Sequence, residues 1–335
     1  MKQRVAVLGA GSWGTALAVH LARVGHDVRL WARDPATVRD IRERRANVIY
    51  LPDVVLPDGV APTDSLEEAV RDTDFIVSAI PSHGCRAVMR AVRPHLVPGA
   101  IIVSATKGLE VDSMQRMSDV IRQEVGPAHP VSVLSGPSFA LEVAQERPTV
   151  VLIASNDDIA IERVQEEFRG SYFRLYGSDD VIGVELCGAL KNVIAIAAGV
   201  VEGSGLGHNA LAALITRGLA EIARLTTAAG GRRETPAGLS GLGDLVLTCT
   251  GSLSRNRHVG IELARGRNLH DIVAGMKMVA EGVRTTNAAL ALAARHGVEL
   301  PIATQIAAVL DGRIDVRAGL DALMLRRQRS ETEPA

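Results

Sequence analysis

The stretch that decides the fold is Val5-Ala6-Val7-Leu8, followed by Gly9-Ala10-Gly11-Ser12-Trp13-Gly14 and an apolar segment that begins at Thr15. The three parts predict a buried strand, a glycine-rich turn and a helix. Gly9 permits the tight turn, Gly11 lets the backbone approach a pyrophosphate, and Gly14 lets the helix pack closely on the strand. The N–H groups and the dipole at the start of the helix favour negative charge. The stretch therefore predicts a Rossmann-type dinucleotide site, with an ordinary glycine-rich turn as the alternative.

The residues after the second predicted strand, 28–32, indicate which dinucleotide is bound. Arg33 stands nineteen residues after Gly14, where a site specific for NAD usually has an acidic residue and where an arginine can accept the extra phosphate of NADP. Asp34 precedes Pro35, a pairing typical of a helix N-cap and first helical position. We therefore assign Asp34 to capping and Arg33 to the cofactor. This favours NADP(H) and leaves NAD(H) open.

Composition excludes several classes of protein. The chain has 335 residues, enough for two domains, and a formal net charge of −1, which gives no general attraction to nucleic acid. The longest later uninterrupted apolar run, 193–201, is too short to span a bilayer. The three cysteines are far apart in apolar surroundings and indicate reduced thiols in a cytoplasmic protein, and the histidines show no metal-ligand spacing. The cysteines are Cys85, Cys187 and Cys249.

The pattern of elements changes near residue 180. Before it, short β-branched runs at 75–80, 101–104, 131–134, 150–153 and 172–176 alternate with helical segments, which predicts a mostly parallel, doubly wound sheet. After it, the segments 184–201, 210–229, 260–264, 285–296 and 302–310 all indicate helices. We therefore expect an α/β dinucleotide-binding domain at 1–180, an all-α domain at 181–325, and a frayed tail at 326–335.

Three predicted strands end in segments rich in small polar residues, at 78–83, 104–108 and 135–140. Ligands of open α/β sheets bind beyond the carboxyl ends of the strands. Lys107 is the only cation among these strand ends, so it is a candidate for the substrate or cofactor; an exposed loop lysine is the alternative. Ser138 is expected to cap a helix that begins at Phe139.

Lys191 lies in a predicted helix, 185–199, that is apolar on nearly every face. A buried ammonium is costly unless it faces a cleft or an opposite charge. Desolvation lowers a lysine pKa, which would suit the side chain to donate and accept a proton. A structural ion pair is the alternative.

Two further segments combine polar residues with glycine or with a helix start. Asp244 stands in the glycine-dense stretch 238–245, where the backbone can approach a small polyol closely. Ser254, Arg255 and Asn256 open a predicted helix and offer a hydroxyl, a guanidinium fork and an amide beside the N–H groups of the first turn. This set of donors suits a phosphate monoester.

Eight strings in order resemble the NAD(P)-dependent glycerol-3-phosphate dehydrogenases of the bacterial type: GAGSWGTALA, ATKG, SGPSFA, ALKNVIAIAAG, NALAALITRG, GLGDLVLT, SRNR and VAEGV. The resemblance covers residues 9–310. It implies cofactor contacts from two groups, the first being Gly9, Gly11, Ser12, Trp13, Gly14, Arg33 and Lys107, and the second Ala140, Arg255, Val279 and Glu281. It implies substrate contacts from Lys107, Gly136, Ser138, Lys191, Asp244, Ser254, Arg255 and Asn256. Lys191 would transfer the proton, and Lys107 and Asp244 would assist.

The reaction that the resemblance implies is the reversible reduction of dihydroxyacetone phosphate to sn-glycerol 3-phosphate, which supplies phospholipid synthesis. A homodimer is expected only by analogy, and neither a nucleic-acid partner nor membrane insertion is expected. Three alternative functions remain open: a dehydrogenase acting on a 3-hydroxy acid or ketopantoate, a non-catalytic dinucleotide sensor, and an S-adenosylmethionine methyltransferase. The phosphate-binding residues argue against the other dehydrogenases. The buried Lys191 argues against the sensor, and Arg33 argues against the methyltransferase.

Overall fold

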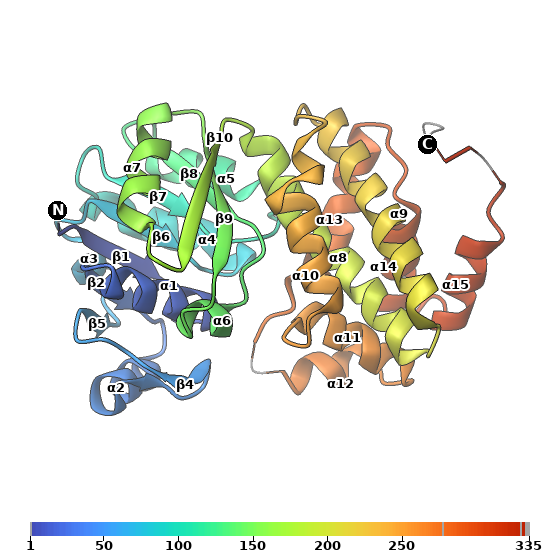
Figure 1. Cartoon of the computed structure of the whole chain (residues 1–335), viewed down its shortest axis with the longest axis horizontal. Coiled ribbons are helices and arrows are strands. Elements are labelled where there is room, and N and C mark those ends of the chain that lie inside the picture. Colours follow the sequence, from blue (N-terminus) through green and yellow to red (C-terminus); the bar gives the residue numbers. More distant parts are fainter. Residues whose placement is uncertain (1, 277, 329, 332–335) are drawn as a thin grey trace. The chain divides into compact units, whose positions relative to one another are not determined.

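The structure of the chain is a computed structural model that describes residues 2–276, 278–328 and 330–331. The chain divides into two compact units, which we describe separately (Figure 1). The first unit comprises Met1–Lys107 and Gln115–Val181, and the second comprises Gly108–Met114 and Ile182–Ala335. The short segment Gly108–Met114 belongs to the second unit although it precedes much of the first, which the sequence did not indicate.

The first unit is built on an eight-stranded sheet with the order β10-β9-β8-β7-β6-β1-β2-β5. All neighbours in this sheet are parallel except β8 and β9, which are antiparallel. The chain proceeds from β1 to β2 on one side and from β6 to β7 on the other, so the strand order reverses at β1, where ligands of such sheets bind. The strands are β1 (Arg4–Leu8), β2 (Asp27–Trp31), β5 (Val60–Thr63), β6 (Phe75–Ser78), β7 (Ile101–Ser104), β8 (Val131–Ser135), β9 (Thr149–Ser155) and β10 (Phe173–Ser178).

The helices of the first unit surround the sheet, and a separate antiparallel pair, β3 (Ala46–Asn47) and β4 (Leu51–Val55), follows α2. The sequence did not indicate β3, which has only two residues, or β4 and β5, whose patterns are interrupted by Pro52 and Pro62. Proline is tolerated in β5 because this strand lies at the edge of the sheet. The helices are α1 (Ser12–Arg23), α2 (Pro35–Arg44), α3 (Leu66–Val70), α4 (Ser82–Val92), α5 (Met117–Val125), α6 (Ala140–Ala144) and α7 (Asp158–Phe168).

The described part of the second unit is helical, as expected. Its central helix is α8 (Val181–Gly203), which is long and apolar enough to cross a membrane by length and composition, so the expectation based on the run 193–201 counted too few residues. Here 94% of its most apolar window is buried, and it supplies much of the core of the unit. The other helices are α9 (Gly207–Ala228), α10 (Asp244–Thr250), α11 (Arg255–Ala264), α12 (Leu269–Ala274), α13 (Glu281–Arg295), α14 (Pro301–Leu310) and α15 (Val316–Met324).

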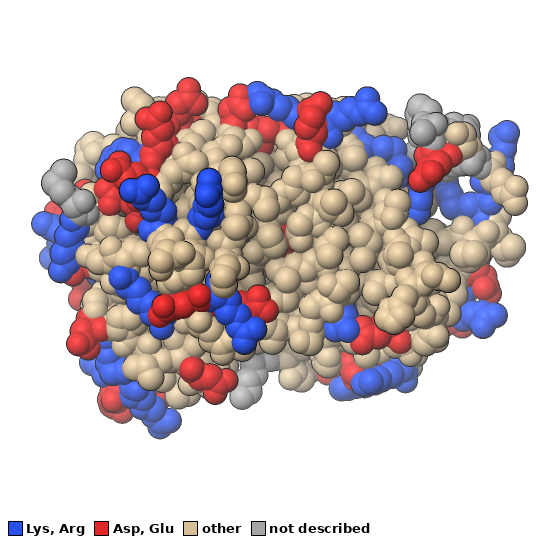
Figure 2. All heavy atoms as spheres, viewed as in Figure 1, with Lys and Arg blue, Asp and Glu red and all other residues tan. Residues whose placement is uncertain are grey.

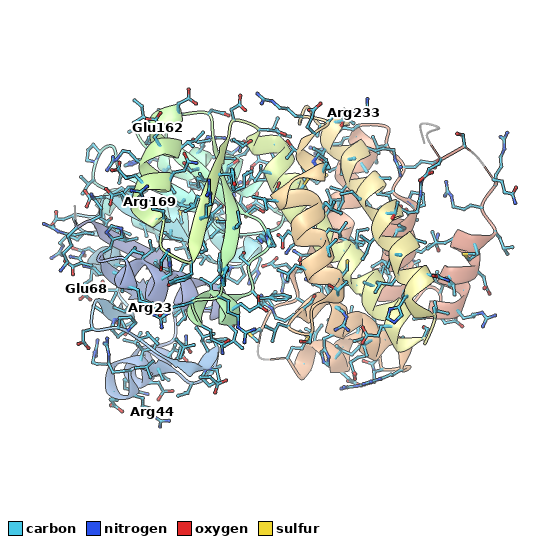
Figure 3. All side chains as sticks on the ribbon, in the orientation of Figure 1. Arg23, Arg44, Glu68, Glu162, Arg169 and Arg233 are labelled. Atoms are coloured by element: carbon cyan, nitrogen blue, oxygen red, sulfur yellow. The ribbon has the colours of Figure 1, made fainter. Side chains whose placement is uncertain are left out.

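The distribution of surface charge and the burial of the cysteines agree with what the composition predicted. On the face that Figure 2 draws, basic and acidic side chains of the described residues are interspersed rather than gathered by sign. Charged side chains such as Arg44 and Arg233 point away from the ribbon (Figure 3). All three cysteines are buried and free, as predicted.

Candidate functional site

Two of the three glycines in the turn between β1 and α1 are required by the packing around them. Gly9 has a φ of +112°, and a Cβ at this position would lie 2.8 Å from the carbonyl oxygen of Ala79. A Cβ on Gly14 would lie 1.9 Å from the carbonyl oxygen of Gly9, so the helix packs on the turn only with glycine there. A Cβ on Gly11 would meet no atom within 4 Å. Packing within the described protein therefore does not require glycine at position 11, and the space beside it is open.

Two side chains hold this turn in place: Asn47, which the sequence reasoning missed, and Ser12, which it named as a cofactor contact. The buried amide of Asn47 donates to the carbonyl oxygen of Ala10 at 2.9 Å and to Oγ1 of Thr15 at 2.8 Å. The hydroxyl of Ser12 donates to the carbonyl oxygen of Tyr50 at 2.7 Å. No sequence pattern indicates these contacts, because they join the turn to β3 and its loop. The turn is therefore preorganised before any cofactor binds.

Arg33 lies two residues after the end of β2, at the carboxyl edge of the sheet where it was predicted, and it is exposed. Asp34 caps α2, as predicted, with its carboxylate accepting from the N–H of Ala36 at 3.0 Å. The indole N–H of Trp13 is buried and has no hydrogen-bond partner among the described residues. A buried donor of this kind normally has an acceptor, so a ligand atom is a natural candidate for it.

Lys107 and Ser138 converge on one backbone carbonyl of the first unit. The ammonium of Lys107 donates to the carbonyl oxygen of Gly136 at 3.0 Å, and the hydroxyl of Ser138 donates to the same oxygen at 3.0 Å. The predicted capping role of Ser138 is wrong, because α6 begins at Ala140 and Phe139 occupies the N-cap position without a side-chain bond. The Ser138 hydroxyl is instead directed back to Gly136.

The second unit places Lys191 beside Asp244 and Thr248. The ammonium of Lys191 bonds to Oδ1 of Asp244 and to Oγ1 of Thr248, the latter at 2.8 Å. The Thr248 hydroxyl donates its own hydrogen to the backbone oxygen of Asp244 at 2.6 Å, so it accepts from Lys191. Lys191 is 7%, Asp244 1% and Thr248 4% exposed. The sequence reasoning missed Thr248, although it lies one helical turn after Asp244.

The carboxylate of Asp244 lies beside Lys191 and bears on whether the lysine carries its charge. Burial alone disfavours an ammonium, but an adjacent carboxylate favours it. The ion pair that the sequence left as an alternative is therefore present, and it directs a proton-bearing nitrogen to one place. Cys249, the next residue after Thr248, contributes no charge, because burial raises the pKa of its thiol to about 12.

The start of α11 carries the candidate phosphate-binding residues. Ser254 is its N-cap and accepts from the N–H of Arg257 at 3.2 Å, as predicted. Asn256 is buried; its amide donates to Oδ1 of Asn192 at 2.9 Å, and its oxygen accepts from the N–H of Gly282 at 3.0 Å. The side-chain amide nitrogen of Asn256 carries two N–H bonds. One of them donates to Asn192, and the other has no acceptor among the described residues.

The remaining candidates of the second unit stand near the start of α13. Arg255 is the first residue of α11 and is exposed, while Glu281 is the first residue of α13 and is close enough to interact with it electrostatically. Val279 lies two residues before Glu281, outside any helix. The candidate residues of the second unit therefore form two groups. One surrounds Lys191, and the other lies at the starts of α11 and α13.

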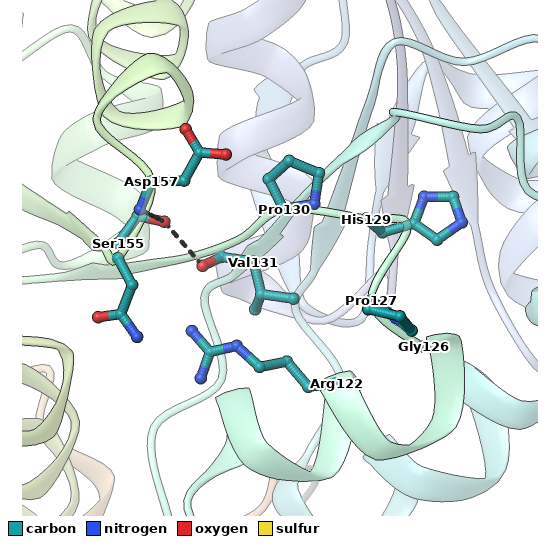
Figure 4. Close-up of a pocket in the computed structure, with 9 residues that line it drawn as sticks. Arg122, Gly126, Pro127, His129, Pro130, Val131, Ser155 and Asp157 are labelled. Carbon is teal, nitrogen blue, oxygen red and sulfur yellow. Dashed lines mark hydrogen bonds between the residues drawn. The ribbon is translucent and has the colours of Figure 1, made fainter.

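A further hollow of about 340 Å³ lies in the first unit and contains none of the candidate residues. It is lined where α5 ends, β8 begins and β9 ends, by residues that include Arg122, His129 and Asp157 (Figure 4). Two of the lining residues are joined by a hydrogen bond, in which the hydroxyl of Ser155 donates to the carbonyl oxygen of Val131 at 3.0 Å. Because β8 begins here, the hollow lies at the edge of the sheet opposite to the glycine turn.

Comparison with known proteins gives one answer for both units. Residues 4–160 match the model described as the NAD-dependent glycerol-3-phosphate dehydrogenase N-terminus, and residues 180–321 match the model for its C-terminus. A relative from Acidobacterium capsulatum named glycerol-3-phosphate dehydrogenase [NAD(P)+] is 52% identical, over 98% of this chain and 99% of its own.

Solved structures agree with this result. A glycerol-3-phosphate dehydrogenase from Coxiella burnetii is 40% identical with a TM-score of 0.94, covering 97% of this chain and 99% of its own. A ketopantoate reductase from Ralstonia eutropha is 17% identical with a TM-score of 0.60, covering 96% and 99%, and shares only the fold. The chain belongs to the NAD-dependent glycerol-3-phosphate dehydrogenase family.

Proposed function

We propose that this chain catalyses the reversible reduction of dihydroxyacetone phosphate to sn-glycerol 3-phosphate, with NADPH preferred over NADH. The observation that carries the proposal is the buried ammonium of Lys191, held by Asp244 and Thr248 inside an apolar helix of a chain that belongs to this oxidoreductase family. The family assignment disfavours the sensor and the methyltransferase, and nothing specific favours a ketopantoate substrate.

Lys191 is the proposed proton donor. When bound, a reduced nicotinamide would supply the hydride that reduces the C2 carbonyl carbon of the substrate. As the C2 oxygen gains negative charge, the ammonium of Lys191 stabilises it and gives it a proton, so that the C–O double bond becomes a secondary alcohol. Asp244 and Thr248 hold the nitrogen in one position throughout. In the reverse direction the neutral amine accepts the same proton.

The start of α11 is the proposed phosphate site. The helix has 10 residues, and its first-turn N–H groups and dipole favour an anion. Ser254, Arg255 and Asn256 add side-chain donors, and Lys107, Gly136 and Ser138 are proposed to contact the substrate as well. Binding of the phosphate, which does not react, positions C2, so its loss should reduce turnover as well as affinity.

The glycine turn and Arg33 are the proposed cofactor residues of the first unit, with Ser12, Trp13 and Ala140. Because Asp34 is used as a helix cap, Arg33 is the residue left to meet the adenosine ribose, and its guanidinium suits the 2′-phosphate of NADPH. Arg33→Gln should lower kcat/KM for NADPH about ten- to a hundredfold and that for NADH little. Arg39→Gln, on the exposed face of α2, is the control.

Lys191→Ala tests the proton-transfer assignment. A positioned general acid contributes roughly a hundred- to ten-thousandfold to turnover, and kcat should fall by a factor in this range. Lys2→Ala is a control lysine variant, because the Lys2 side chain is 63% exposed and pairs with Asp27 on the surface. A Lys191→Ala variant with nearly unchanged turnover would refute the assignment. A cytoplasmic location, a homodimer and supply of phospholipid synthesis complete the proposal.

A further inference from the structure

The second unit holds a pocket of about 570 Å³ that contains none of the candidate site residues. This C-terminal pocket is lined by residues of α8, α9, α14 and α15 and by residues after α15. Figure 1 labels these helices. Its lining includes Val201, Leu214, Ile306, Val309, Leu320 and Leu323. The volume falls within the roughly 300–1,000 Å³ typical of small-molecule sites. The pocket is therefore large enough for a ligand of its own.

The chemistry of the lining restricts the kind of ligand. Among the described residues that line the pocket, the apolar ones are all aliphatic or methionine, and none is aromatic, histidine or cysteine. A base or a flat ring would find no ring to stack on, and a metal ion would find none of the nitrogen or sulfur ligands that it prefers in such sites. A flexible aliphatic chain is the ligand that such walls accommodate.

The charged residues of the lining are mostly basic. Four arginines, Arg217, Arg224, Arg326 and Arg327, contribute to it, against Glu221 and Glu331. The carboxylate of Glu221 is occupied, because it accepts from the N–H groups of Ile302 at 2.6 Å and Ala303 at 3.3 Å, at the start of α14.

Some of this positive charge is already paired. Glu299 lies just outside the lining and forms an ion pair with Arg326 at 3.0 Å. Its backbone oxygen also accepts a hydrogen bond from Arg224 at 3.2 Å. Arg217 and Arg327 are exposed. Among the described residues, a net positive charge therefore accompanies the aliphatic walls.

We propose that the C-terminal pocket binds a single-chain amphiphile, with its aliphatic chain among α8, α9, α14 and α15 and its anionic head at the arginines. Guanidinium groups bind both carboxylate and phosphate heads, so a fatty acid and an alkyl phosphate share this chemistry. The proposal does not depend on the dehydrogenase activity, and binding is measured without cofactor or substrate. Failure of one therefore leaves the other intact.

Calorimetric titration of the full chain with octanoate, decanoate and dodecanoate, each below its micelle concentration, tests the aliphatic part. Affinity should rise about fourfold for each added methylene, which corresponds to about 0.8 kcal/mol. Dodecyl phosphate, titrated in parallel, identifies the preferred head by its relative affinity. Decanol, which has no charge, should bind more weakly than decanoate. Absence of binding by every probe, or affinity independent of chain length, would overturn the proposal.

Variants locate the binding. Arg217→Glu should weaken dodecanoate about tenfold or more and leave decanol unchanged, because only the anionic head meets that guanidinium. Arg233→Glu is the matched control, since Arg233 is an exposed arginine of the same unit outside the pocket (Figure 3).

Ala213→Trp, on the exposed side of α9, fills the pocket and should abolish binding of all probes while the circular dichroism spectrum stays the same. Binding that survives both Arg217→Glu and Ala213→Trp refutes the site. If no probe binds and Ala213→Trp converts a dimer into a monomer in sedimentation, a second copy covers the pocket and the proposal is wrong.

Discussion

Removal of either member of the Lys191–Asp244 pair should destabilise the second unit strongly. The two side chains are 7% and 1% exposed, so each single replacement leaves a charge buried without its partner. Breaking a buried pair in this way costs about 3–5 kcal/mol. Lys191→Met and Asp244→Leu should each lower the free energy of unfolding by that amount. The double variant carries no unpaired charge and should lose much less, about 1 kcal/mol, because apolar side chains of similar size replace both.

Urea unfolding followed by far-ultraviolet circular dichroism is the suitable assay. The chain has two tryptophans, Trp13 and Trp31, and both lie in the first unit, so their fluorescence does not report on the second. The second unit is largely helical and dominates the dichroism signal. If the costs of the two single variants add up to the cost of the double variant, the two charges do not interact and the reasoning is refuted.

Three further predictions concern the turn, the proton donor and acid stability. Gly11→Ala should keep its melting temperature and lose NADPH affinity, whereas Gly14→Ala should unfold at lower temperature; equal effects on folding would contradict the packing argument. Thr248→Val should lower kcat about ten- to a hundredfold with little change in KM, since Lys191 loses an acceptor; a change confined to KM would contradict this. Burial lowers the pKa of His20 to about 4 from 6.5, so the unfolded chain takes up its proton first and up to about 3 kcal/mol of stability is lost as the pH falls from 6.5 to 4. Tryptophan fluorescence should show this loss in the wild type but not in His20→Gln; identical pH profiles would contradict it.

The sequence predicted those features that depend on local chemistry. The glycine turn, the cap at Asp34 and the cap at Ser254 lie where the residues placed them, because each depends on neighbours within a few positions. The predicted strand 101–104 has the bounds of β7, since a continuous β-branched run in a parallel sheet is buried along its length. The doubly wound sheet and the helical second half followed from the order of such elements.

Features that depend on distant partners were missed or wrong. Ser138 has the composition of a cap, but its hydroxyl bonds to Gly136 and the helix starts later. Asn47 bonds across 37 residues to the turn, and Lys191 across 57 residues to Thr248, so no local pattern indicates either contact. The ion pair of Lys191 was one of two alternatives, because apolarity around a lysine does not reveal which side chain faces it.

The most direct test of the proposed function is the loss of NADPH absorbance, and separately of NADH absorbance, when dihydroxyacetone phosphate is added to the purified protein. We expect oxidation of both cofactors, faster with NADPH, and no comparable oxidation with unphosphorylated dihydroxyacetone. Oxidation that is equally fast without the phosphate would contradict the phosphate site at the start of α11. No oxidation of either cofactor by a folded protein that binds NADPH would contradict the proposed reaction itself.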